Sequence, residues 1–154
     1  MKIGVISDTH NFLDPKIPES FAGVGHILHA GDIGSPGILA ELELVAPVTA
    51  VAGNTDDPAL CYAPSKTIVI AGRKFFIQHI VHPQDLAERR QRHFAGQRPD
   101  AVIFGHTHKA FCETIDGVLF VNPGSAGKPR FGAERSAAIL HCDGQGMRAE
   151  FLSL

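Results

Sequence analysis

Short runs of apolar and β-branched residues recur along the chain, each bounded by glycine, aspartate or asparagine. Runs of this kind are typical of buried strands, and they predict strands at residues 2–6, 26–30, 48–52, 67–70, 74–78 and 101–104. Helical patterns lie between several of them, at residues 17–22, 35–44 and 83–95. Strands that alternate with helices indicate an α/β fold with a largely parallel sheet.

The pattern changes after Phe104 to paired strands joined by tight turns. Residues 110–115 and 118–121 flank one Asp-Gly pair, and residues 136–142 and 147–152 flank another. Asp-Gly between alternating runs is a strong hairpin signal. Because no repeat or linker divides the chain and 154 residues can bury one core, we expect a single domain over residues 1–154.

Composition and charge argue against several classes of protein. Apolar residues make up 44% and charged residues 19%, with a formal net charge of −2, so no overall positive field attracts nucleic acid or anionic lipid. The first apolar stretch is too short for a signal peptide, and no run approaches the roughly 20 apolar residues of a membrane span. Cys61, Cys112 and Cys142 form no C-x-x-C pair. We expect a cytoplasmic protein with no membrane or specific nucleic-acid partner; a homo-oligomer is compatible with the sequence.

Potential metal ligands follow five of the predicted strands. Ligands of open α/β sheets bind beyond the carboxyl ends of the strands, so residues far apart in the sequence converge on one edge. The candidates are Asp8, His10, Asp32, Asn54, His79, His106 and His108.

Local spacing supports this convergence. Side chains two residues apart in extended backbone share a side, which would pair Asp8 with His10 and His106 with His108. Glycine precedes Asp32, Asn54 and His106, where a missing Cβ permits unusual dihedrals or a close approach of other atoms.

The chemistry of the donors favours a phosphate ester as substrate. Carboxylate, amide and imidazole donors without thiolate suit Mn²⁺, Fe, Zn²⁺, Co²⁺, Ni²⁺ or Mg²⁺. Two divalent ions bring more positive charge than Asp8 and Asp32 return, and an anionic phosphoryl group would neutralise the surplus.

These motifs together resemble the calcineurin-like metallophosphoesterase superfamily. The resemblance rests on Asp8-x-His10, Gly31-Asp32, Gly53-Asn54, the post-strand His79 and Gly105-His106-x-His108. The Ser7-Asp8-Thr9-His10 opening and Asn122-Pro123-Gly124-Ser125 are similar to its compact prokaryotic phosphodiesterase branch.

The resemblance implies two facing mixed β-sheets flanked by helices, with a dimetal site at the carboxyl ends of strands. It implies that Asp8, His10 and His108 hold one ion, that Asn54, His79 and His106 hold the other, and that Asp32 bridges them. Two divalent metal ions are the expected cofactors, with manganese ahead of Ni, Fe, Zn, Co and Mg.

We therefore expect a metal-dependent phosphoric ester hydrolase, more specifically a phosphodiesterase, in which a hydroxide bridging the two ions attacks the phosphorus of a small-molecule phosphate ester. Asp32, Asn54 and His79 are the expected catalytic residues. The alternative is a non-catalytic interaction scaffold with a residual metal site, similar to the retromer subunit of this fold. That subunit has lost ligand histidines, whereas this chain retains all of them.

Two positions depart from the superfamily pattern. Thr55 stands where a histidine often protonates the leaving group, and a hydroxyl is a poor general acid. Ile80 stands where glycine usually follows the histidine ligand, and the nearby His82 is a candidate proton donor. Asn122 and Ser125 are expected to support the metal edge, with a phosphate contact as the alternative.

Overall fold

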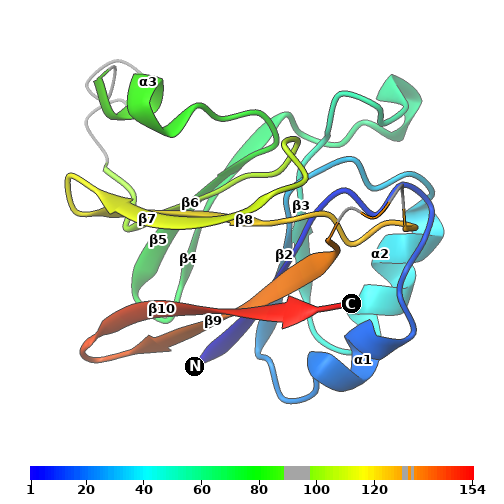
Figure 1. Cartoon of the computed structure of the whole chain (residues 1–154), viewed down its shortest axis with the longest axis horizontal. Helices are drawn as coiled ribbons and strands as arrows, with labels where there is room; N and C mark the ends of the chain where they lie inside the picture. The colour runs from blue at the N-terminus through cyan, green and yellow to red at the C-terminus, as the bar shows by residue number, and fades with distance from the viewer. Residues whose placement is uncertain (89–97, 130–131, 133) are drawn as a thin grey trace.

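The computed structural model describes residues 1–88, 98–129, 132 and 134–154. It contains two five-stranded sheets, of order β10-β9-β1-β2-β3 and β4-β5-β6-β8-β7 (Figure 1). The strands are β1 (Lys2–Ile6), β2 (His26–His29), β3 (Val48–Ala50), β4 (Ser65–Ile70), β5 (Arg73–Gln78), β6 (Ala101–Ile103), β7 (Ala110–Ile115), β8 (Val118–Pro123), β9 (Ser136–Asp143) and β10 (Gly146–Ser153). The expected pair of mixed sheets is confirmed.

Both sheets combine parallel and antiparallel neighbours. In the first sheet β2 is parallel to β1 and β3, whereas β9 is antiparallel to β1 and β10. In the second sheet β6 is parallel to β5 and β8, and the β4–β5 and β7–β8 hairpins are antiparallel. The prediction of a largely parallel sheet is therefore wrong. The run at 67–70 turns back directly onto the next strand, and the two later hairpins, which the sequence predicts, add further antiparallel pairs.

The helices cover the outer faces of the sheets. Helices α1 (Lys16–Ser20) and α2 (Pro36–Glu43) lie beside the first sheet (Figure 1), where Ile17, Phe21 and Leu42 share a buried cluster with Ile27 of β2. A 3₁₀ turn, η1 (Pro58–Leu60), precedes β4, and α3 (Pro83–Glu88) contacts β7. The remainder of the helix predicted over 83–95 lies outside the described residues. Within the described ranges, no helix is both long and apolar enough to cross a membrane.

The main core fills the space between the two sheets. Val5 of β1 and Leu140 of β9 pack there with Phe75 of β5 and Ile103 of β6, all fully buried. Phe76, between two residues of this core, points to the opposite face and joins a separate apolar cluster. Strands covered on both faces explain why the sequence shows continuous apolar runs rather than alternation.

Loops that leave four strands meet at one edge of the molecule. The N–H of Asp8, after β1, donates to the carbonyl of Gly31, after β2 (3.0 Å). The N–H of Gly105, after β6, donates to the carbonyl of His79, after β5 (2.9 Å). Each sheet thus contributes a joined pair of loops, as expected where parallel strands end together.

Candidate metal centre

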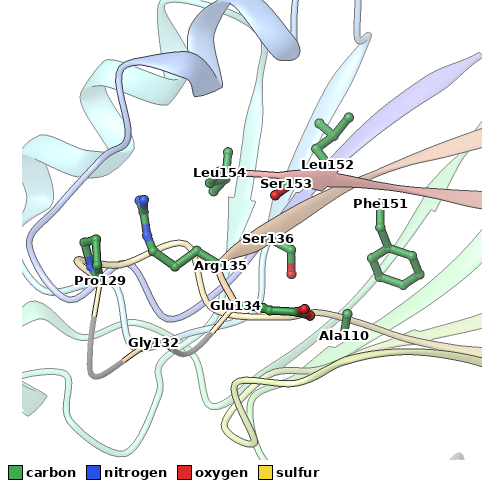
Figure 2. A pocket seen from close by; sticks show the side chains of 10 residues that line it. All are labelled: Ala110, Pro129, Gly132, Glu134, Arg135, Ser136, Phe151, Leu152, Ser153 and Leu154. Carbon is green, nitrogen blue, oxygen red and sulfur yellow. The ribbon is translucent and has the colours of Figure 1, made fainter.

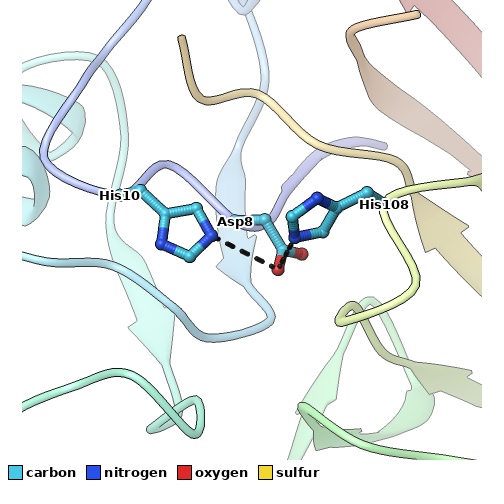
Figure 3. Close-up of side chains that lie close together, drawn as sticks. All are labelled: Asp8, His10 and His108. Carbon is cyan, nitrogen blue, oxygen red and sulfur yellow. Dashed lines mark ion pairs between the residues drawn. The ribbon is translucent and has the colours of Figure 1, made fainter. Parts of the chain in front are cut away.

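The first group of potential ligands comprises Asp8, His10 and His108, which lie around one carboxylate oxygen (Figure 3). The Nε2 of His108 is 3.0 Å from Oδ1 of Asp8, and the Nε2 of His10 is 3.9 Å from the same atom. All three ligand atoms lie within 4.8 Å of one another. Asp8 and His10 come from the first sheet and His108 from the second, so the group spans both.

The second group comprises Asp8, Asp32 and His79, all buried. The Nε2 of His79 is 3.4 Å from Oδ2 of Asp32 and 3.9 Å from Oδ1 of Asp8. The same Oδ2 of Asp32 is 3.7 Å from Nε2 of His10, so it lies between one histidine of each predicted metal position. Asp8, rather than Asp32, is the residue shared by the two groups.

Among the residues that the structure describes, three buried polar atoms of this cluster lack a hydrogen-bond partner: Oδ1 of Asp8, Nε2 of His10 and Nε2 of His79. The Nδ1 of His79 lies 2.7 Å from the carbonyl of Ala30 and must donate to it, so a neutral ring presents a lone pair at Nε2. Each unmade hydrogen bond of this kind costs roughly 1–3 kcal/mol. Lone pairs that converge without donors fit a cation as their common partner.

Asp32 is held in its charged form. Burial raises the pKa of Asp32, but the hydrogen bond from the N–H of Thr55 (2.9 Å) and the charges of His79 and His10 outweigh it, and the pKa lies below its ordinary value. Asp32 is therefore a carboxylate at neutral pH, as a metal ligand must be.

The backbone around the cluster is left-handed at most of the candidate ligands. Positive φ angles occur at Asp8 (55°), His10 (46°), Asp32 (52°), His106 (68°) and His108 (59°). Such angles are uncommon for residues with a side chain and concentrate at functional sites. The prediction that the two pairs extend from β backbone is wrong: their side chains converge because tight loops turn them inward.

Glycines beside the ligands allow the loops to pack closely. A Cβ on Gly53 would collide with the carboxyl group and N–H of Asp32, and a Cβ on Gly105 would collide with Oγ of Ser7. The same Cβ of Gly105 would lie 2.7 Å from Oδ2 of Asp8. The predicted close approach of another backbone is confirmed at Gly53, which meets the N–H of Asp32, whereas the close neighbours of Gly105 are side chains.

His106 and Asn54 lie nearer the surface than the other candidates. The exposed His106 donates its main-chain N–H to Oδ2 of Asp8 (3.1 Å), and its ring packs edge-on against His79 at 5.4 Å between centroids. Asn54 is exposed and lies outside the two groups, although its neighbours Gly53 and Thr55 both contact Asp32.

Two fully buried hydroxyl residues beside the ligands were not singled out from the sequence. The Oγ of Ser7 donates to Oδ2 of Asp8 (2.6 Å), and the Oγ1 of Thr9 donates to the carbonyl of Ile33 (2.9 Å). Both belong to the segment that also carries Asp8 and His10. The available signal was the run of four polar residues, Ser7-Asp8-Thr9-His10, directly after an apolar strand.

A groove of about 620 Å³ lies elsewhere, beside β10 (Figure 2). Its described lining includes Glu134, Arg135, Ser136 and Phe151, and no histidine is among these described residues. It is therefore distinct from the metal centre.

Comparisons with known proteins agree with this arrangement. The model of the calcineurin-like phosphoesterase superfamily domain matches residues 1–145. A probable metallophosphoesterase of Methanothermobacter thermautotrophicus is 35% identical, and the match covers 99% of this chain and 92% of that protein. A solved archaeal phosphodiesterase is 29% identical with a TM-score of 0.76, covering 99% of this chain and 100% of that one. Zinc-bound Vps29 from Entamoeba histolytica shares the fold, with 20% identity, a TM-score of 0.78 and 99% of each chain covered. The chain belongs to the calcineurin-like phosphoesterase superfamily.

Proposed function

We propose that this protein is a phosphodiesterase that depends on two divalent metal ions. The observation that carries the proposal is the convergence of unpartnered ligand atoms from Asp8, His10 and His79 on one buried point between the sheets. The two carboxylates repel one another, and a cation between them and the imidazole nitrogens would relieve that repulsion. The donors present therefore fit the metal ions that the superfamily implies.

The proposed division of ligands is the one that the resemblance implies, and its first set coincides with the first group. Asp8, His10 and His108 would hold one ion; Asn54, His79 and His106 would hold the other. The position of Oδ2 of Asp32, between Nε2 of His10 and Nε2 of His79, supports Asp32 as the bridge. The ring contact of His106 with His79 supports their assignment to one ion.

When bound, two divalent ions lower the pKa of a water molecule and offset the charge of a phosphoryl group. Around them, the chain supplies orientation and charge. Asp32 remains ionised because Thr55 donates to it, and His79 is held in one tautomer by the carbonyl of Ala30. Asp32, Asn54 and His79 are the proposed catalytic residues, because each would hold or bridge an ion that contacts the reacting group.

The donors near the cluster favour substrates whose leaving group needs no protonation. Thr55 offers a hydroxyl in place of an imidazole, and its N–H is already donated to Asp32. The exposed His106 and half-exposed His108 place the centre at the surface, open to a small phosphate ester. We propose Mn²⁺ as the preferred ion; a donor set rich in oxygen and imidazole and without thiolate is compatible with it.

The competing function is an interaction scaffold that keeps a metal site without catalysis. The likeness to Vps29 extends to the fold alone at 20% identity. All four histidines of the superfamily ligand pattern are present in this chain, which favours the enzyme.

Hydrolysis of an activated aryl phosphodiester by metal-stripped and Mn²⁺-loaded protein separates these functions. We expect activity that depends on metal and falls by at least roughly 100-fold in Asp32→Asn and His79→Ala. The matched control is His141→Ala, whose imidazole bonds Glu150 on the β9–β10 hairpin, and it should retain activity. A metal-loaded protein inert toward monoesters and diesters alike would support the scaffold.

A further inference from the structure

The loop that carries His106 and His108 has strained backbone at both histidines. Both histidines have left-handed backbone, with φ of 68° and 59°, and Thr107 lies between them. Such conformations persist only where surrounding contacts over-determine them. The contacts that the protein itself makes with this loop are therefore of interest.

Asn122 supplies the required contacts. It lies near the end of β8 and is fully buried. Its Nδ2 donates to the carbonyl of Gly105 (2.8 Å) and to Oγ1 of Thr107 (3.0 Å), one acceptor on each side of His106. Its Oδ1 accepts from the N–H of Gly124 (2.9 Å), which fixes the orientation of the amide. Both hydrogens of Nδ2 are thus committed to the loop, and neither is available for a phosphate.

The segment that follows Asn122 contacts the other ligand loop. Ser125 donates its Oγ to the carbonyl of Asp8 (3.2 Å), and the N–H of Ala126 donates to the carbonyl of Ser7 (3.0 Å). Asn122 and the connection from β8 to β9 therefore contact both loops that supply the first ligand group, the loop after β1 and the loop after β6. None of the predicted ligands lies on this connection.

We propose that Asn122 is a positioning residue that sets the His106–His108 loop before metal binds. This inference rests on the proposed metal-dependent function. Without the amide, the loop would relax toward ordinary backbone angles, and metal binding would have to restore the strained form. Supporting residues of this kind typically change metal affinity by roughly 10- to 100-fold.

Titration calorimetry of metal-stripped protein with Mn²⁺ tests the proposal. We expect Asn122→Ala to weaken Mn²⁺ binding by roughly 10- to 100-fold while the protein remains folded. Thr107→Val removes one acceptor from the exposed side of the same contact and should weaken binding by a smaller factor. The two changes together should be less than additive, because they break one shared interaction. Ser136→Ala is the matched control: it deletes a hydrogen bond to Pro123 in the same connection and should leave affinity unchanged.

Amide hydrogen exchange of the metal-free proteins gives a second readout. Asn122→Ala should lose protection at residues 105–109, and Ser136→Ala should keep it. Unchanged Mn²⁺ affinity and unchanged protection in both Asn122→Ala and Thr107→Val would overturn the proposal. If Asn122→Ala did not fold, Thr107→Val alone would decide in the same way. Wild-type protein that bound no divalent metal would instead refute the proposed function.

Discussion

His29 donates a hydrogen bond to Thr9, with 3.0 Å between its Nε2 and Oγ1 of the threonine. The direction follows from the other side of the ring, where the N–H of Gly31 donates to Nδ1 (3.2 Å) and leaves the ring proton on Nε2. The hydroxyl of Thr9 in turn donates a hydrogen bond to the carbonyl of Ile33. A neutral imidazole thus links the strand end before Asp32 to the loop between Asp8 and His10.

Stability should fall in mild acid because of His29. Complete burial, aided by the charges of His79 and His10, lowers the pKa of His29 to about 3. Between pH 6.5 and 3 the unfolded chain binds a proton at His29 that the folded protein excludes. The stability that comes from keeping His29 neutral is therefore present above pH 6.5 and is lost as the pH falls below it. For this residue we expect about 2 kcal/mol less unfolding free energy at pH 5 than at pH 7.5.

Urea denaturation of metal-free protein at the two pH values measures this loss, and His29→Gln should have a shallower pH dependence. Burial also lowers the pKa of the partly buried His26, so His26→Gln should act in the same direction by less. An unchanged pH dependence in His29→Gln would contradict the assignment.

Gly105→Ala should disrupt the metal centre without a new charge or polar group. The added Cβ collides with Ser7 and comes within 2.7 Å of the Asp8 carboxylate, so the two sheets must separate locally. We expect a loss of about 1–3 kcal/mol in stability and a large loss of Mn²⁺ affinity. Thermal denaturation and calorimetry measure the two effects.

Gly144→Ala is the control for that change, since a Cβ there meets no atom within 4 Å. It should alter stability by less than about 0.5 kcal/mol and leave metal affinity intact. Equal behaviour of the two variants would show that the contact of Gly105 is unimportant.

Asp56→Asn should weaken the second ligand group. The Asp56 carboxylate accepts from the N–H of Gly34 (2.9 Å) and the N–H of Gly53 (2.8 Å), and so joins the loops that carry Asp32 and Asn54. An amide can accept only one of these bonds and presents a donor to the other. We expect a roughly 10- to 100-fold loss in activity at limiting Mn²⁺.

The adjacent Asp57 provides a close comparison. It is exposed, and its side chain accepts a hydrogen bond from the N–H of Ala59 at the start of η1. Asp57→Asn should therefore retain wild-type activity, and a comparable loss in both variants would point to a charge effect instead of positioning.

Asp14→Asn should destabilise the protein through its nearly buried ion pair. Arg135 reaches Oδ2 of Asp14 at 2.6 Å and also donates to the carbonyl of Gly127. The N–H of Lys16 lowers the pKa of Asp14; burial opposes this, and Arg135 lowers it further. The ion pair therefore stabilises the fold at pH values above the ordinary carboxyl pKa. This stabilisation is lost as the pH falls through the pKa of Asp14 in the folded protein.

We expect Asp14→Asn to cost about 2 kcal/mol at neutral pH, measured by urea denaturation. Arg73 and Asp100 form a comparison pair whose side chains are 34% and 37% exposed. Arg73→Gln should cost less than about 1 kcal/mol. A larger loss for the exposed pair would refute the argument from burial.

Turn chemistry explains which parts of the fold were predictable. Asp116 and Gly117 both adopt positive φ, 49° and 75°. The pair Asp-Gly is a sequence signal that predicts this turn geometry. Ala71 and Gly72 adopt a similar pair, 50° and 74°, but alanine gives no such signal. The local pattern therefore does not predict the β4–β5 hairpin.

The candidate ligands were predictable because strand ends mark them, whereas their geometry was not. Left-handed backbone at Asp8 and His108 depends on contacts from distant segments, including the N–H of His106 on Asp8. No local pattern encodes those contacts. The hydrogen bonds of Asp56 and Asn122 were equally unpredictable, because they depend on which main-chain groups tertiary packing leaves unpaired.

The order of the strands also has a consequence for biosynthesis. β1, which leads into Asp8, is flanked in its sheet by β2 and by β9, a strand that is made after all the candidate metal ligands. During synthesis the sheet that leads into Asp8 therefore stays incomplete until residues 136–143 have been made. A chain interrupted before β9 would lack one of the two neighbours that hold β1, so the metal centre can assemble only after its last ligand has already been synthesised.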